Sequence, residues 1–172
     1  MLQRRFDTNR LRAVPPEAVS ARSCPRTEDL IAACLRGAGP ANRAWARPFG
    51  PVRIDLPFRM LQTDSAEIAR RACLQLDGSW AMQDASALGR LAVRGRALLA
   101  DVAWWRPLQA DDVWDAGIAP SAAALRGFEP RRATLIVLEG EPDEAGLQAL
   151  AEIDARAGSL RRAVRVLVVQ AG

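Results

Sequence analysis

The hydrophobic pattern of the chain is most regular in its C-terminal third. Residues 133–138 form an unbroken apolar run of strand length, and residues 163–169 form a second one. Runs of this kind are typical of strands that are buried on both faces. The segment between them, residues 142–157, carries apolar side chains at helical spacing: Leu147, Leu150, Ile153 and Ala157. The pattern predicts a β-α-β unit whose two strands are parallel in one sheet.

Packing within this unit gives a further expectation. The side chains that its strands and helix turn inward should be buried together in a single core. They are Leu135, Val137, Leu150, Ile153, Val166 and Val168. Truncating a core leucine such as Leu150 to alanine should then cost about 2–5 kcal/mol.

A strand and a helix are predicted near the middle of the chain. Apolar and polar residues alternate over residues 52–60, which predicts a strand. Because Pro57 has no amide hydrogen, this strand is expected at a sheet edge or at a bulge. Asp64 and Glu67 have the spacing of a capping box and predict a helix that ends at Gly78. Its buried stripe is expected to be Ala69, Ala72, Cys73 and Leu76.

The longest predicted helix covers residues 86–105. Its apolar residues fall on one stripe, which we expect to face the core: Leu88, Leu91, Ala92, Leu98, Leu99, Val102 and Trp105. Gly89 and Gly95 each lower the stability of this helix, so its first half could instead form a strand. A shorter helix is predicted over residues 28–36, and residues 79–83 are a candidate for a middle strand.

Together these elements predict one α/β domain over residues 27–172, with an α+β arrangement as the alternative. A ferredoxin-like fold with an insertion and a small three-layer α/β sheet both fit the order of elements. Residues 107–131 are expected to be irregular, with short helical turns near Asp111 and Ser121.

The first 26 residues differ from the rest. Residues 1–26 carry three prolines and six arginines without a hydrophobic period, which predicts an extended arm. We expect the arm to lie on a partner or on a neighbouring subunit, so that its deletion abolishes association and leaves the fold intact.

Composition fits a single globular domain. The chain has 172 residues, of which 49% are hydrophobic and 26% are charged, a balance well away from that of disordered chains. No apolar run reaches the ~18–20 residues that a membrane span requires, and the first residues lack an apolar signal core. We therefore expect a cytoplasmic protein without membrane contact.

The residue types that are missing limit the chemistry. The chain has no His, and all 24 of its basic residues are Arg. This excludes Ser-His and Cys-His nucleophiles, His-ligated metals, and sites that need a Lys. The three cysteines are odd in number and include no C-x-x-C pair, which indicates buried apolar residues. We predict no catalytic residues, no cofactor and no metal.

One acidic segment could alternatively bind a metal ion. Residues 139–144 hold four carboxylates directly after a predicted strand. Carboxylate oxygens can bind a divalent cation. The alternative, which the sequence favours, is an acidic first turn that stabilises the positive end of a helix.

Charge and tryptophan point to interaction residues. Residues 1–60 carry 11 arginines against five acidic residues, whereas residues 107–160 carry four against ten. The basic segment can bind an anionic partner, but the sequence favours its lying across an acidic neighbour in its own fold or in the next subunit. Arg beside Trp is typical of protein interfaces and can also stack on nucleic-acid bases. On a helix, Trp105 continues the core stripe and Trp104 falls at its exposed border. The candidate interaction residues are Arg4, Arg5, Arg10, Arg12, Trp45, Trp104 and Arg106.

A short segment has a family resemblance. Residues 91–99, Leu-Ala-Val-Arg-Gly-Arg-Ala-Leu-Leu, resemble the pyrophosphate loop of the GNAT acyltransferases. The resemblance implies acetyl-CoA binding and acyl transfer without a histidine. The chain departs from the family because Ala92 stands where an Arg or Gln is usual, and because the expected upstream strands are not evident.

The sequence therefore predicts a non-catalytic accessory or assembly protein that binds another protein or a second copy of itself. A nucleic-acid-binding protein with an Arg and Trp surface is the alternative, and an acyl-CoA-dependent acyltransferase is the third. A steep fall of affinity with salt would mark nucleic acid. Thermal stabilisation by acetyl-CoA would mark the enzyme.

Overall fold

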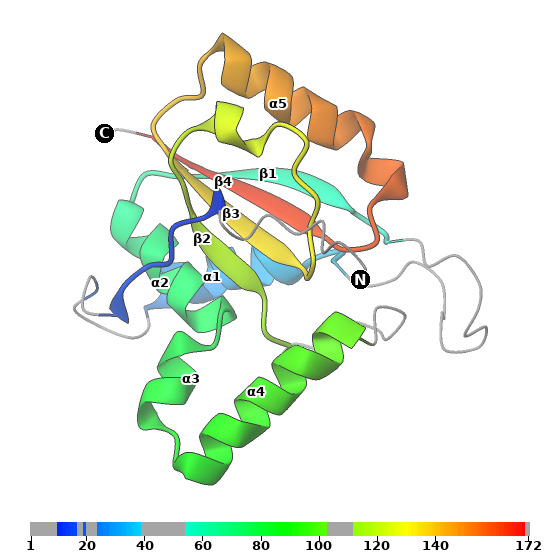
Figure 1. The fold of residues 1–172 in the computed structure, drawn as a ribbon. Helices are drawn as coiled ribbons and strands as arrows, with labels where there is room; N and C mark the ends of the chain where they lie inside the picture. Colours follow the sequence, from blue (N-terminus) through cyan, green and yellow to red (C-terminus); the bar gives the residue numbers. More distant parts are fainter. Residues whose placement is uncertain (1–9, 17–18, 20–23, 39–53, 103–111, 171–172) are drawn as a thin grey trace.

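A four-stranded parallel sheet forms the centre of the structure (Figure 1). This computed structural model describes residues 10–16, 19, 24–38, 54–102 and 112–170. In spatial order the strands are β1 (Phe58–Thr63), β4 (Val164–Val169), β3 (Thr134–Glu139) and β2 (Asp115–Ala119). All neighbouring strands pair in parallel. The α/β class is therefore confirmed, and the ferredoxin-like alternative is wrong because its sheet needs antiparallel neighbours.

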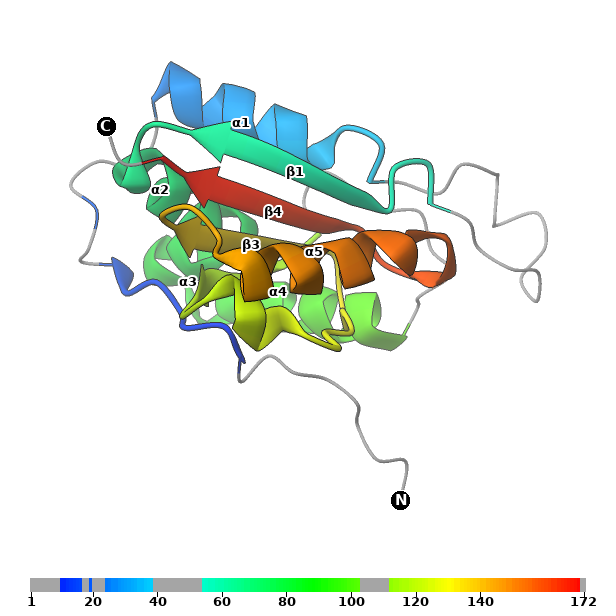
Figure 2. The same ribbon diagram turned by 90° about the horizontal axis from the view of Figure 1, so that it is seen from above.

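Helices lie on both faces of the sheet. The helices are α1 (Pro25–Leu35), α2 (Ala66–Leu76), α3 (Ser79–Asp84), α4 (Ala87–Val102) and α5 (Glu144–Ala155). α1 and α2 pack on one face, and α5 covers the other together with a 3₁₀ turn at Ala122–Leu125. Figure 2 shows α5 in front of the strands, with α2, α3 and α4 behind them. This is the three-layer arrangement that the sequence left open.

The predicted β-α-β unit is confirmed in β3, α5 and β4. β3 and β4 pair in parallel, with Leu135 opposite Arg165. α5 begins two residues later than predicted, because the Asp143 carboxylate accepts a hydrogen bond from the amide of Gly146 (2.8 Å) and caps the helix. Leu147 is exposed rather than buried, since it lies on the outer side of α5.

The six residues expected in one core are all buried, but the sheet divides them between two cores. Leu135 and Val137 face the α1 and α2 side. The other four lie on the α5 side: Leu150, Ile153, Val166 and Val168. Successive side chains of a strand point to opposite faces. A strand that is buried on both faces therefore contributes to both cores.

The first strand lies further along the chain than predicted. The sequence predicts a strand over residues 52–60, whereas β1 covers Phe58–Thr63. Pro57 directly precedes β1, and β1 lies at the edge of the sheet, as expected from the missing amide hydrogen. The edge position also leaves Met60 exposed, although the alternation predicts it inside.

Two helices on the β1 side match their predicted positions closely. α1 starts three residues before the predicted helix over 28–36, with Pro25 in its first turn. α2 is capped by Ser65 and not by Asp64, since the Ser65 hydroxyl accepts a hydrogen bond from the amide of Ile68 (3.3 Å). The predicted stripe of α2 is buried as expected: Ala69, Ala72, Cys73 and Leu76.

β2 is a strand that the sequence pattern does not predict. Its five residues, Asp-Ala-Gly-Ile-Ala, hold one large apolar side chain and several residues of low β-propensity. The candidate middle strand at residues 79–83 is wrong, because these residues lie in α3. The helical turn expected near Ser121 is confirmed as the 3₁₀ turn. The turn expected near Asp111 lies partly outside the described residues, and no helix follows at 112–114.

The N-terminal segment from residue 10 onward is part of the domain. Arg12 and Ile118 exchange two backbone hydrogen bonds (2.8 and 2.9 Å), so the segment pairs with the outer edge of β2. Val14 is buried in the core on the α1 side. Gly117 permits this approach, because a Cβ there would lie 2.8 Å from the Arg12 carbonyl oxygen. Residues 10–16 therefore lie on their own domain rather than on a partner, whereas residues 1–9 of the predicted arm lie outside the described part of the chain.

Arg165 lies fully buried in β4, between two other strands. Its guanidinium donates to the carbonyl oxygens of Cys34 (2.9 Å) and Arg36 (3.0 Å), at the C-terminal end of α1. It also donates to the carbonyl oxygens of Leu56 (2.9 Å) and Val164 (3.1 Å). Burial lowers the pKa of Arg165 to about 10, so the group remains charged at neutral pH. The cation satisfies helix carbonyls that have no partner within the helix.

The cysteines follow their predicted burial in two of three cases. Cys34 and Cys73 are buried, whereas Cys24 is half-exposed. Burial raises the pKa of the Cys34 thiol to about 12, and it raises the pKa of Cys73 as well. Both buried thiols are therefore protonated over the physiological range.

Two N-terminal truncations test the pairing on β2. Deleting residues 1–9 retains the pairing, whereas deleting residues 1–14 removes Val14 from the core and both backbone bonds to Ile118. The longer deletion should have a free energy of unfolding at least about 2 kcal/mol below that of the shorter one. Urea unfolding measures both values, and equal stability of the two proteins would contradict the pairing.

Substituting Arg165 tests the buried guanidinium. Arg165→Met should lower the free energy of unfolding by at least about 3 kcal/mol, because the buried carbonyl of Cys34 and the partly buried carbonyls of Arg36 and Leu56 lose their donor. Arg165→Lys should be little more stable than Arg165→Met, since one ammonium group cannot reach carbonyls on both segments. Arg90→Met on the exposed side of α4 is the control. Similar losses from Arg165→Met and Arg90→Met in urea unfolding would be the opposing result.

Alkaline pH tests the buried thiols. The ordinary pKa of a thiol is 9.0, and burial keeps Cys34 and Cys73 protonated above it. The folded state then binds more protons than the unfolded state, so the free energy of unfolding falls as pH rises. Between pH 9 and 10 the fall should reach up to about 1.4 kcal/mol per thiol and pH unit.

A double variant identifies the origin of this fall. Cys34→Ala combined with Cys73→Ala should flatten the dependence between pH 9 and 10 in urea titrations. Above pH 10 the lowered pKa of Arg165 acts in the opposite direction, because the unfolded chain then holds the extra proton. An unchanged slope between pH 9 and 10 in the double variant would refute the assignment to the thiols.

Candidate functional site

Two of the predicted interaction residues hold the N-terminal segment on the domain. Arg12 pairs through its backbone with Ile118 at the edge of β2. Arg10 donates a side-chain hydrogen bond to the carbonyl oxygen of Ala124 (3.0 Å) in the 3₁₀ turn. The other predicted residues lie outside the described part of the chain: Arg4, Arg5, Trp45, Trp104 and Arg106. Trp105, expected in the core, lies outside it as well.

The large apolar side chains with the greatest exposure in the described structure lie on α4. Leu88, Leu91 and Leu98 are 79, 66 and 62% exposed. Their spacing of three and seven residues places them on one side of the helix, which we call the leucine face. The sequence correctly predicts a helical stripe here, but its expected burial in the core is wrong for these three residues.

α4 turns small residues toward the rest of the domain. Gly89, Val93 and Ala97 recur every four residues and are partly buried. Val93 lines a cavity of about 210 Å³ together with Gly78 and Val113, which belong to the body of the domain. Val93 is five positions from both Leu88 and Leu98, about 140° away around the helix, so the leucine face points away from the side that lines this cavity.

Arginines border the leucine face. Arg90 and Arg94 are exposed and lie one turn apart. Arg94 follows Leu91 by three residues and precedes Leu98 by four, so it lies beside both leucines. α4 holds three arginines and one acidic residue, Asp101 in its last turn. The result is an exposed apolar stripe with a positively charged margin.

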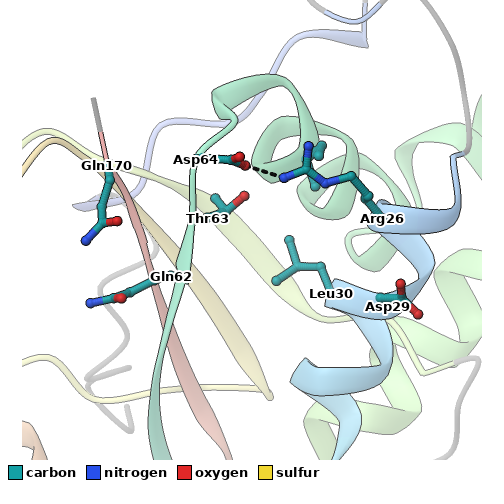
Figure 3. Close-up of a pocket in the computed structure, with 8 residues that line it drawn as sticks. Arg26, Asp29, Leu30, Gln62, Thr63, Asp64 and Gln170 are labelled. Carbon is teal, nitrogen blue, oxygen red and sulfur yellow. Dashed lines mark hydrogen bonds and ion pairs between the residues drawn. The ribbon is translucent and has the colours of Figure 1, made fainter. Parts of the chain in front are cut away.

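A second candidate lies at the carboxyl end of β1, the end at which parallel sheets usually bind ligands. Figure 3 shows this open pocket of about 480 Å³ between β1, the end of β4 and the start of α1. Gln62 and Gln170 lie on one side, and Arg26 forms an ion pair with Asp64 on the other. The two paired side chains are 63 and 66% exposed. No buried polar group among the lining residues is directed into the pocket, so it offers no activated group for chemistry.

The acidic segment at residues 139–144 stabilises the fold. Glu139 forms an ion pair with Arg70 of α2 (2.6 Å), and Asp143 caps α5. Within the described ranges, no group of three or more Asp, Glu or Cys side chains is arranged to hold a metal ion. The capping bond supports the interpretation of this segment as an acidic helix start.

The segment that resembles an acyltransferase loop lies inside a helix. Residues 91–99 belong to α4 and follow α3 rather than a strand. The amides within a helix donate to carbonyls one turn earlier, so they are not free to bind a pyrophosphate. No helix in the described ranges is long and apolar enough to cross a membrane.

The sequence interpretation missed the charged margin of α4. Arg90 and Arg94 are absent from the predicted interaction residues, which lie in the N-terminal arm and at or beside tryptophans. The available signal was the charge composition of the helix, because α4 holds three arginines and one acidic residue beside a leucine stripe.

Comparisons with known proteins give no further guide to these surfaces. No protein-family model, no curated protein and no solved structure matches this chain. The leucine face and the β1 pocket are therefore interpreted from their own geometry, and the leucine face is the stronger candidate.

Proposed function

We propose that this chain is a non-catalytic accessory protein of the cytoplasm that binds another protein through the leucine face of α4. The observation that carries the proposal is the exposure of Leu88, Leu91 and Leu98 on one side of a helix whose opposite side is partly buried. Apolar patches on a soluble domain commonly mark binding surfaces.

Burial of the leucine face would supply much of the binding free energy. Full burial of one leucine side chain contributes about 1.5–3 kcal/mol. An amphipathic helix with leucines on one side fits a hydrophobic groove or the side of another helix. The exposed Arg90 and Arg94 would steer an acidic partner to this surface.

A nucleic-acid-binding function has one supporting observation. Three exposed arginines lie on α4, Arg90, Arg94 and Arg96, and the chain carries a net charge of +4. Phosphates would pair with these arginines but would leave the adjacent leucines in water. Protein binding uses both parts of the surface, so we favour it. A slope of log affinity against log salt near −0.9 per phosphate contact would favour nucleic acid instead.

The composition supports a role without catalysis. The chain contains neither His nor Lys, the residues that most often supply general bases and Schiff bases. The third candidate, an acyl-CoA-dependent acyltransferase, remains open to a simple test. A rise in melting temperature on addition of acetyl-CoA would favour it over the binding role.

Photo-crosslinking within cells that naturally make the full chain tests the proposed surface. A photo-reactive amino acid at position 91 should give a covalent adduct with a protein. The same group at Ala32, an exposed position on α1, is the matched control and should give none. Adducts at position 32 but not at positions 88, 91 and 98, or adducts that a nuclease removes, would contradict the proposal.

Substitution separates binding from stability. Leu91→Asp should abolish the adduct formed from position 88, while its free energy of unfolding changes by less than about 0.5 kcal/mol, because the side chain is exposed. Leu150→Ala, at a buried position of α5, should instead lower the free energy of unfolding by about 2–5 kcal/mol. If Leu91→Asp unfolds the domain in urea titrations, the leucine face is structural.

A further inference from the structure

The outer side of α5 is a second exposed surface with complementary properties. Leu147 is 54% exposed and is the large apolar side chain on this side of the helix. Ala151 and Ala155 follow it at intervals of four residues and are exposed. Glu144 and Asp154 are exposed beside this row. α5 therefore presents a shallow apolar row with acidic margins.

The charges of α4 and α5 are opposite. α5 carries three acidic residues, Glu144, Glu152 and Asp154, and no Arg, whereas α4 carries three Arg and one acidic residue, Asp101. Two α4 helices placed face to face would bring Arg90 and Arg94 of one copy toward those of the other. Like charges at close range oppose association, whereas α4 against α5 brings opposite charges together.

The shapes of the two surfaces also fit each other. Leu88, Leu91 and Leu98 project from α4, and the alanines of α5 leave low positions along the helix. Large side chains of one helix pack into the spaces between the side chains of another when the second helix carries small residues there. Leu147 lies beside these positions and extends the apolar contact.

The fold keeps the two surfaces apart within one copy. α5 covers one face of the sheet, and α4 extends from the opposite side (Figure 1). A copy cannot place its own α4 on its own α5 without losing the fold. Contact between the two surfaces therefore requires two molecules.

We propose that a second copy of this chain occupies the leucine face, with α4 of one molecule on the outer side of α5 of the next. The inference rests on the proposed function, because it uses the same binding surface and names its occupant. The contact joins two different surfaces, so each associated pair keeps one α4 and one α5 open for a further copy. The chain therefore forms an assembly whose size increases with concentration.

Light scattering on the full chain tests the assembly. The molar mass should increase with protein concentration beyond that of a dimer, and it should fall in high salt, because the marginal charges are exposed and screened. Leu91→Asp and Leu147→Asp should each be monomeric, since each removes one of the two surfaces. Both variants should retain the melting temperature of the parent chain.

Mixing the two variants gives the decisive result. Leu91→Asp keeps its α5 surface and Leu147→Asp keeps its α4 surface, so an equimolar mixture should form a 1:1 dimer and no larger species. A Leu147→Asp variant that still dimerises alone would show that α4 pairs with α4, and the inference would be overturned.

Light scattering tests the self-association, and crosslinking in cells tests the proposed function. A parent chain that is monomeric at all concentrations overturns the self-association. If position 91 still gives an adduct with a different protein in cells, the proposed function holds with another occupant. If it gives no protein adduct either, both fail.

Discussion

The architecture depends on one buried cation. Arg165 lies in a central strand, and its guanidinium donates to carbonyl oxygens of α1 and of the segment before β1. No carboxylate is among these partners, so backbone dipoles stabilise the charge. This fixes the end of α1 over the sheet and sets the path by which the chain enters β1. Gly37 lies at the same junction with a positive φ of 66°, a conformation that a residue with a Cβ adopts only with strain.

The sequence predicts the elements whose pattern is set by burial alone. β3 and β4 are apolar along their whole length because both of their faces are covered, and α2 has a regular buried stripe. β2 is not predicted from the sequence, because it is stabilised by its neighbours, β3 on one side and the N-terminal segment on the other. Its own residues carry almost no strand signal. The hydrogen bonds of Arg165 cannot be predicted from the sequence either, since an Arg in an apolar run does not indicate which carbonyl oxygens it will contact.

The candidate site was predictable in part. The periodicity of Leu88, Leu91 and Leu98 predicts a helical stripe, and the structure confirms the helix. Periodicity does not reveal which side of a helix meets the domain when small residues form a second row. Gly89, Val93 and Ala97 form the partly buried row of α4, and they are less hydrophobic than the exposed leucines on the other side. The expected interaction residues beside tryptophans depended on composition, which carries no information about which residues converge in space.

Residues on a surface that is separate from the two cores can be substituted without loss of the fold. The cores on either side of the sheet are closed by α1, α2 and α5, and Arg165 links the first of these to β4. The leucine face lies on a helix that neither core includes. Exposed substitutions on α4 are therefore expected to change the free energy of unfolding little, whereas substitutions of the side chains under α5 are expected to lower it. This difference matters because the free energy of unfolding of a domain is small, so a surface outside both cores can vary without loss of the fold.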